Sequence, residues 1–99
     1  MSPSEARTKL IHLLQNAYSG ELAAYYAYEG HQQSVSNETE RQELIKIRDE
    51  EWVHRECVGR ILKALGAAAR PRREFIMTCV GRTIGFLCKI GGWLIPMYG

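Results

Sequence analysis

Two short stretches, SGELAAYYAYEGH (residues 19–31) and EEWVH (residues 50–54), place acidic side chains within long apolar stripes. Around the first stretch, side chains recur at steps of three and four residues, which is the spacing of one face of an α-helix. The members of this stripe are Leu10, Leu14, Ala17, Glu21, Ala24, Tyr25 and Tyr28. Because Glu21 lies in mid-stripe, we expect its carboxylate to face the interior of a helical bundle.

The stripe around the second stretch has the same spacing and contains two polar residues. Its members are Leu44, Ile47, Glu51, His54, Val58, Ile61 and Leu65. Residues three apart on a helix point the same way, so Glu51 and His54 can bind the same metal ion. Glu50, four residues before His54, is an alternative ligand, although Glu51 lies nearer the centre of the apolar stripe.

The energetic cost of these residues favours a metal site. An uncompensated buried carboxylate costs several kcal/mol, against a total domain stability of roughly 5–15 kcal/mol. A glutamate that reaches solvent, or a hydrogen-bonded core histidine, would explain either residue type alone. Glu21, Glu51 and His54 together, near the middle of two stripes, indicate the carboxylate and imidazole ligands of a metal centre in a helical bundle.

The length of 99 residues allows one domain, residues 1–99, with a core small enough to benefit from oligomerisation or a bound metal. Residues 1–59 contain six Lys or Arg against ten Asp or Glu, a net charge of −4, whereas residues 60–99 contain seven against one, a net charge of +6. The basic part has no nucleic-acid recognition motif, so we expect no nucleic-acid partner.

The helix boundaries can be predicted from capping residues. Ser2 is the expected N-cap of a first helix that has Pro3 at its first position and ends near Gln33. Asn37 is the expected N-cap of a second helix that runs to Leu65 and stops at Gly66. The predicted fold class is all-α, with residues 1–66 forming an antiparallel, metal-binding helical hairpin.

Residues 67–99 are predicted to form a linker and a third helix over 74–90, closed by Gly91-Gly92. One narrow polar row interrupts this otherwise apolar helix and consists of Thr78, Arg82, Gly85 and Lys89. Two charges within the run argue against a membrane span. We expect the apolar sector to pack on protein, or else to make peripheral membrane contact through 74–95, with WLIPMYG (93–99) adding to a partner surface.

Cys57, Cys79 and Cys88 are an odd number of cysteines, and no signal peptide precedes them. This pattern predicts reduced thiols and a cytoplasmic protein, with the inner face of the membrane as the place of any peripheral contact.

The two quoted stretches, followed by an arginine-proline linker and a glycine-rich apolar helix, resemble the N-terminal half of the demethoxyubiquinone hydroxylases. These are membrane-associated di-iron monooxygenases of the ferritin-like superfamily, and the similarity spans nearly the whole chain. The resemblance implies that Glu21 is the ligand of the first helix, Glu51 the bridging carboxylate of the second, and His54 its histidine. It also implies two iron ions per complete four-helix bundle, for which manganese or zinc could substitute.

The chain departs from this family because it lacks the two further helices that supply another Glu and another Glu-x-x-His. After His54 the only acids are Glu56 and Glu74, and no histidine follows. A second copy would complete the ligand set, so we expect a homo-oligomer, in the first place a dimer with an intersubunit site, a solution that encapsulated ferritins resemble. The alternative is a half-domain interaction protein or a hydroxylase fragment that needs a second polypeptide, with the metal structural or absent.

The expected chemistry of a complete site is oxidative. The ligands leave open whether an O₂-dependent centre would hydroxylate an organic substrate or oxidise iron as a ferroxidase. No catalytic residue is assigned. Tyr25 lies one turn from Glu21 and could hydrogen-bond a ligand or carry an oxidising equivalent, but its expected role is to fill the core.

Overall fold

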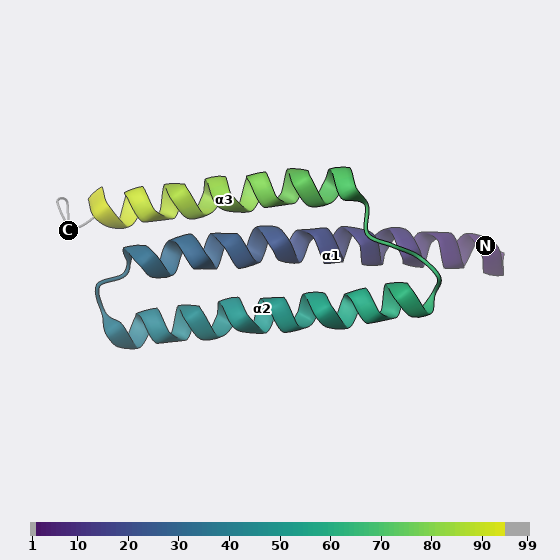
Figure 1. The fold of residues 1–99 in the computed structure, drawn as a ribbon, viewed down its shortest axis with the longest axis horizontal. Helices are drawn as coiled ribbons and strands as arrows, with labels where there is room; N and C mark the ends of the chain where they lie inside the picture. The colour runs from purple at the N-terminus through teal and green to yellow at the C-terminus, as the bar shows by residue number, and fades with distance from the viewer. Residues whose placement is uncertain (1, 95–99) are drawn as a thin grey trace.

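The computed structural model describes residues 2–94, with side chains described to Gly91. These residues form three α-helices in the order α1 (Pro3–Ser34), α2 (Glu38–Ala64) and α3 (Pro71–Leu94) (Figure 1). The prediction of an all-α fold is therefore confirmed for this part of the chain. Residues 95–99, which were expected to contribute to a partner surface, lie outside the described residues.

The capping predictions explain where α1 and α2 begin and where α2 ends. The side chain of Ser2 accepts a hydrogen bond from the Glu5 amide, and that of Asn37 accepts one from the Glu40 amide. At the end of α2, Gly66 has a φ of +73°. Its amide and that of the next residue donate to carbonyls of the last turn, which is the Schellman arrangement that glycine permits.

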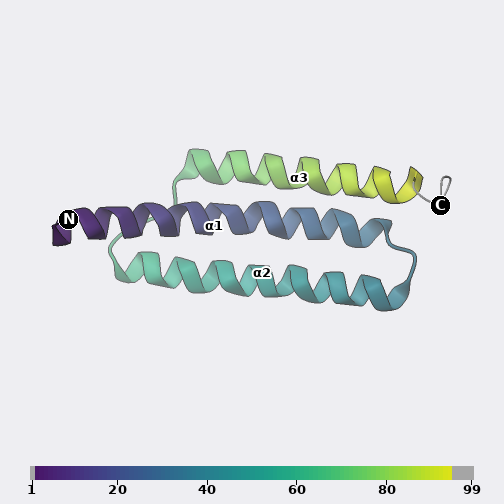
Figure 2. The same cartoon turned by 180° about the vertical axis from the view of Figure 1, so that it is seen from behind.

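The long helix α1 lies between the other two (Figures 1 and 2). It pairs with α2 as an antiparallel hairpin, and α3 runs alongside its other flank in the same direction as α1. The linker returns past the N-terminal half of α1, where the side-chain amide of Gln15 donates to the Ala68 carbonyl at 2.8 Å. As a result, α3 is fixed to α1, whereas α2 and α3 do not pack on each other within residues 2–94.

Small residues form the contact between α1 and α3. Ser19 is fully buried, and Gly81 and Gly85 are buried on α3. A methyl group on Gly81 would lie 2.6 Å from the Cα atom of Ala23, and one on Gly30 would overlap the backbone of Gly85. Glycine is needed at these positions because the two backbones approach each other without intervening side chains.

The predicted limits of the third helix, 74–90, are wrong at both ends. The helix starts at Pro71, because proline is favoured at the first helical position and the Arg70 carbonyl already accepts the Glu74 amide at 2.9 Å. It also continues through Gly91-Gly92 to Leu94. A helical glycine costs about 1 kcal/mol relative to alanine, which does not by itself stop a helix whose preceding turns pack on α1.

The packing of α3 also differs from the expected pattern. The row predicted to be polar is not uniformly so, because Gly85 within it is buried against α1. Six large apolar side chains of α3 are exposed, namely Phe75, Ile76, Val80, Ile84, Phe86 and Leu87. Small residues, rather than these apolar side chains, hold α3 against α1. The prediction that the apolar sector packs on protein or lipid would therefore require a partner other than α1 and α2.

The buried core of the described chain is small. Leu22 and Leu62 are its buried apolar side chains, while members of both predicted stripes, including Leu10 and Ile61, are exposed. A single chain thus leaves the predicted inner faces of the hairpin open. The ferritin-like bundle and the dimer that would close it remain predictions. None of the described helices combines the length and apolarity that a membrane crossing requires.

Candidate metal centre

The α1 component of the candidate site is Glu21, near the middle of that helix. Its neighbour Leu22 is buried, and Glu21 itself is half-buried. The Oε2 atom of Glu21 is buried and has no hydrogen-bond partner. A carboxylate oxygen withdrawn from solvent without a donor is costly, so this atom is suited to a cation or a proton.

The α2 component consists of Glu51 and His54, one turn apart. One ligand atom from each of Glu21, Glu51 and His54 can be chosen so that all three lie within 4.8 Å of one another. The structure thus brings together the three predicted ligands from two helices. Glu50 is exposed and lines a different groove with Asp49 and Val53, so the structure favours Glu51 over Glu50 as the partner of Glu21.

The proximity of the two carboxylates alters the protonation of the site. Burial, and next the hydrogen bond and charge of neighbouring Glu51, raise the pKa of Glu21 from 4.5 to about 7. Desolvation and like charge both disfavour the ionised form. A bound cation would reverse this effect, because it stabilises both carboxylates in their charged state.

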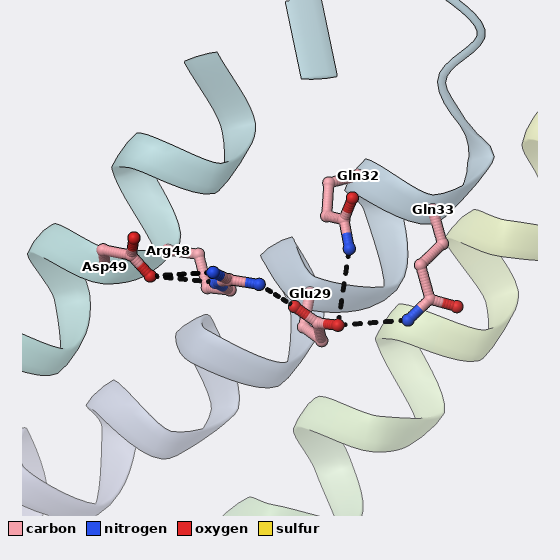
Figure 3. A network of polar contacts seen from close by, with 5 residues as sticks. All are labelled: Glu29, Gln32, Gln33, Arg48 and Asp49. Carbon is pink, nitrogen blue, oxygen red and sulfur yellow. Dashed lines mark hydrogen bonds and ion pairs between the residues drawn. The ribbon is translucent and has the colours of Figure 1, made fainter. Parts of the chain in front are cut away.

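Two arginines of α2 bracket Glu51 at positions 48 and 55, yet both pair with other acids. Arg48 bonds to Glu29 of α1 and, at 2.9 Å, to Asp49 (Figure 3). Arg55 pairs with Glu74 of α3 at 2.8 Å. Among the described residues, neither Glu21 nor Glu51 has an arginine or lysine within ion-pair distance, so their charge is left for another cation.

The Glu29 network fixes the hairpin near its turn. Glu29 accepts hydrogen bonds from Arg48 and from the side-chain amides of Gln32 and Gln33 (Figure 3). Burial raises the pKa of Glu29, but the hydrogen bonds from Arg48 and Gln33 outweigh this effect and lower it. Glu29 therefore stays charged and holds α2 in register with α1 on one side of the candidate site.

Aromatic side chains occupy the seam between α1 and α2 beside the site. The Tyr25 ring lies 5.1 Å from that of Trp52 and 5.2 Å from that of Tyr26, centroid to centroid. These residues, with Asp49 and Val53, line an open groove of about 430 Å³. Tyr25 thus lies in the helix seam, and its expected role in filling a bundle core stays a prediction.

Arg48, Arg55 and Trp52 were not among the site residues predicted from the sequence. Positions 48, 51 and 55 are spaced by three and four residues, so they share one side of α2. This spacing could have indicated that the two arginines lie beside Glu51. Apart from Asp49 and Trp52 of α2, the acids and rings that the arginines contact come from α1 and α3, and only the fold identifies them.

The site lies open in the single chain. His54 is exposed, and exposed apolar side chains from both stripes, Leu10 of α1 and Ile61 of α2, remain uncovered. No protein-family model, curated protein or solved structure matches this chain. The functional assignment therefore depends on the geometry of this site.

Proposed function

We propose that this chain supplies one half of a carboxylate- and imidazole-ligated dimetal centre, which a second copy of the chain completes. The observation that carries the proposal is the convergence of Glu21, Glu51 and His54, whose ligand atoms lie within 4.8 Å of one another. Two acids and a histidine brought together from different helices suit a metal-ligand set, because among the described residues no arginine or lysine forms an ion pair with either acid.

The residues fit iron. Oxygen and imidazole nitrogen are suitable donors for ferrous iron and also for manganese or zinc. The partnerless Oε2 atom of Glu21 and the engagement of Arg48 and Arg55 elsewhere leave room for such a cation. Glu21, Glu51 and His54 would hold the metal, and a pair of iron ions would supply the electrons for reduction of O₂ in an oxidative reaction.

One chain provides too few ligands for two metals. The di-iron bundles of this type use a Glu from each of two helices and a Glu-x-x-His from each of the other two. Two copies of the α1–α2 hairpin would provide this set if their open faces met. The exposed apolar side chains Leu10 and Ile61 on those faces give such a contact a driving force.

The contribution of the chain's own residues to the reaction follows from their positions. Glu21 and Glu51 would offset the charge of a bound metal, and His54 would add an imidazole nitrogen donor. Tyr25 and Trp52 pack on each other in the seam beside the ligands and line an open groove there. The resemblance to the hydroxylases favours an origin in substrate hydroxylation, and a ferroxidase reaction is the other form of the same proposal.

A second candidate function is that of an interaction protein that needs a different polypeptide. The observation that favours it is the small core, in which Leu22 and Leu62 are the buried apolar side chains of the described chain. Any partner that covers the open faces would satisfy this requirement, with the metal structural or absent.

Native mass spectrometry of the purified chain, prepared anaerobically with ferrous iron, separates the two candidates. A homodimer that retains two irons supports the dimetal centre. A metal-free monomer, or assembly only after addition of another chain, contradicts it and supports the interaction protein.

A further inference from the structure

Arg55 directly follows the candidate ligand His54 and connects all three helices. Its Nη1 atom donates to the backbone carbonyl of Tyr18 in α1 at 3.0 Å. The same atom lies 2.8 Å and 3.2 Å from the two carboxylate oxygens of Glu74 in α3. The exposed fractions of the Arg55 and Glu74 side chains are only 14% and 17%, so this pair is largely withdrawn from solvent.

The guanidinium group of Arg55 is also held by an aromatic ring. Its central carbon lies 3.7 Å from the centroid of the Tyr18 ring. Gly59, one turn later on α2, leaves space for that ring, since a methyl group there would lie 2.9 Å from its Cε1 atom. A planar guanidinium group that stacks on a ring and donates to two acceptors is confined to one orientation, which a lysine could not reproduce.

This arrangement lies within one turn of every residue of the candidate site. Tyr18 is three residues before Glu21 on α1, and Arg55 is next to His54 and four residues after Glu51 on α2. Since α2 and α3 do not otherwise pack on each other in residues 2–94, the pair of Arg55 and Glu74 is a direct link between α3 and the ligand-bearing segment of α2.

We propose that Arg55 and Glu74 are positioning residues for this site and make its metal affinity depend on the docking of α3. Arg55 fixes the rotation of α2 about its axis, and this rotation decides whether Glu51 and His54 face Glu21. Glu74 holds Arg55 through the same Nη1 atom that donates to the Tyr18 carbonyl. Any partner that displaces α3 would thereby weaken the site. The inference rests on the proposed function, because the site is the metal centre described above.

The test uses Co²⁺ as a spectroscopic probe of the full chain. Glu74→Ala and Arg55→Met should each weaken Co²⁺ binding by about 10–100-fold, the usual effect of removing a residue that orients a ligand, and should change the visible absorption bands at saturation. Arg55→Lys should restore only part of the affinity. Glu38→Ala is the matched control, because it removes an exposed pair with Arg41 at 3.5 Å, far from the site along α2, and should leave binding unchanged.

A purely structural role predicts a different outcome. In that case Glu74→Ala would lower the urea midpoint of unfolding but retain the native Co²⁺ affinity and the native absorption bands. This result would overturn the inference, while loss of affinity together with altered bands would support it.

A metal-independent measurement separates failure of this inference from failure of the proposed function. In the metal-free protein, Glu74→Ala should shift the imidazole NMR signals of His54 more than those of His12 and His31, which are exposed near the two ends of α1. If the native chain binds no Co²⁺, the proposed metal centre fails, but a selective shift of His54 still supports the positioning role. If the His54 signals do not move, the inference is wrong whether or not metal binds.

Discussion

Glu21 of α1 and Glu51 of α2 face each other across the seam of the hairpin, with carboxylate oxygens that come within 4.8 Å, and within residues 2–94 no arginine or lysine forms an ion pair with either. The nearest arginines along α2 bond to Glu29 and Glu74 instead. Two like charges at this separation raise the energy of the metal-free chain. The closeness of these two carboxylates is the reason for the expected effects of metal, pH and ligand substitution on stability and metal binding.

Removal of any one ligand should abolish stoichiometric iron binding. We expect Glu21→Ala, Glu51→Ala and His54→Ala each to lose the tight site, because among the described residues no other acid, histidine or cysteine belongs to this group. Anaerobic titration with ferrous iron measures this effect. Glu50→Ala is the matched control, since Glu50 is exposed and lines another groove, and it should keep native stoichiometry. Two tight irons in the dimer of the Glu51 variant would contradict the assignment.

The stability of the metal-free protein should fall as pH rises. The pKa of Glu21 is about 7 in the folded chain, against an ordinary value of 4.5. The folded state holds this proton more tightly than the unfolded state, so the associated stability is complete below the ordinary pKa and is lost as pH rises through the folded value. Urea midpoints of chelator-treated protein should therefore be lower at about pH 8 than at about pH 5. Glu21→Gln should flatten this dependence, and a steep dependence in that variant would assign it to another group.

Glu29 should produce the opposite pH dependence. Hydrogen bonds from Arg48 and Gln33 lower its pKa despite burial, so its contribution to stability is present above the ordinary value of 4.5 and is lost as pH falls through the folded value. Glu29→Gln should make the protein less sensitive to acid, as measured by circular dichroism during acid titration. At neutral pH, Arg48→Met should cost about 1–3 kcal/mol in urea unfolding, because it leaves a partly buried carboxylate without its main donor. An unchanged urea midpoint in the Arg48→Met variant would show that the pair of Glu29 and Arg48 does not stabilise the fold.

The glycine contacts between α1 and α3 should give opposite results for the same substitution at two positions. Gly81→Ala should destabilise the chain by about 1–3 kcal/mol, because the new methyl group would lie 2.6 Å from the Cα atom of Ala23. Gly20→Ala, where no described atom outside the local helix backbone lies within 4 Å of the added methyl group, should stabilise the chain by about 0.5–1 kcal/mol through helix propensity. Urea unfolding of both variants measures the difference. Equal effects at the two positions would mean that α3 does not pack closely on α1.

The exposed apolar side chains of α3 should matter for assembly rather than for the fold of the chain. Ile84 and Leu87 are 42% and 60% exposed, so Ile84→Glu and Leu87→Glu should leave the helix content unchanged. We expect both variants to lose dimerisation or vesicle binding, as measured by analytical ultracentrifugation and liposome flotation. Dependence of flotation on Arg82 and Lys89, at about 1 kcal/mol per basic residue on anionic vesicles, would identify lipid as the partner. Variants that stay dimeric and bind vesicles as the native chain does would contradict this role.

The sequence alone determined the helices of the hairpin and the ligand candidates, because both depend on local rules. Ser2, Asn37 and Gly66 act through hydrogen bonds and backbone angles within a few residues of themselves. Helical spacing alone places Glu51 and His54 on one side of α2. The choice of Glu51 over Glu50 followed from its place in the apolar stripe.

The packing of α3 and the pairing of charged side chains depend on residues distant in the sequence, and only the tertiary structure revealed them. It showed that α3 packs on α1 through Gly81 and Gly85 and leaves six large apolar side chains exposed. Hydrophobic periodicity could not predict this packing, because it contains no information on close contacts between helix backbones. It also paired Arg48 with Glu29 and Arg55 with Glu74, across separations of 19 residues. Charge pairing depends on which helices meet and in which direction, so the freedom of Glu21 and Glu51 to bind a cation is a property of the fold.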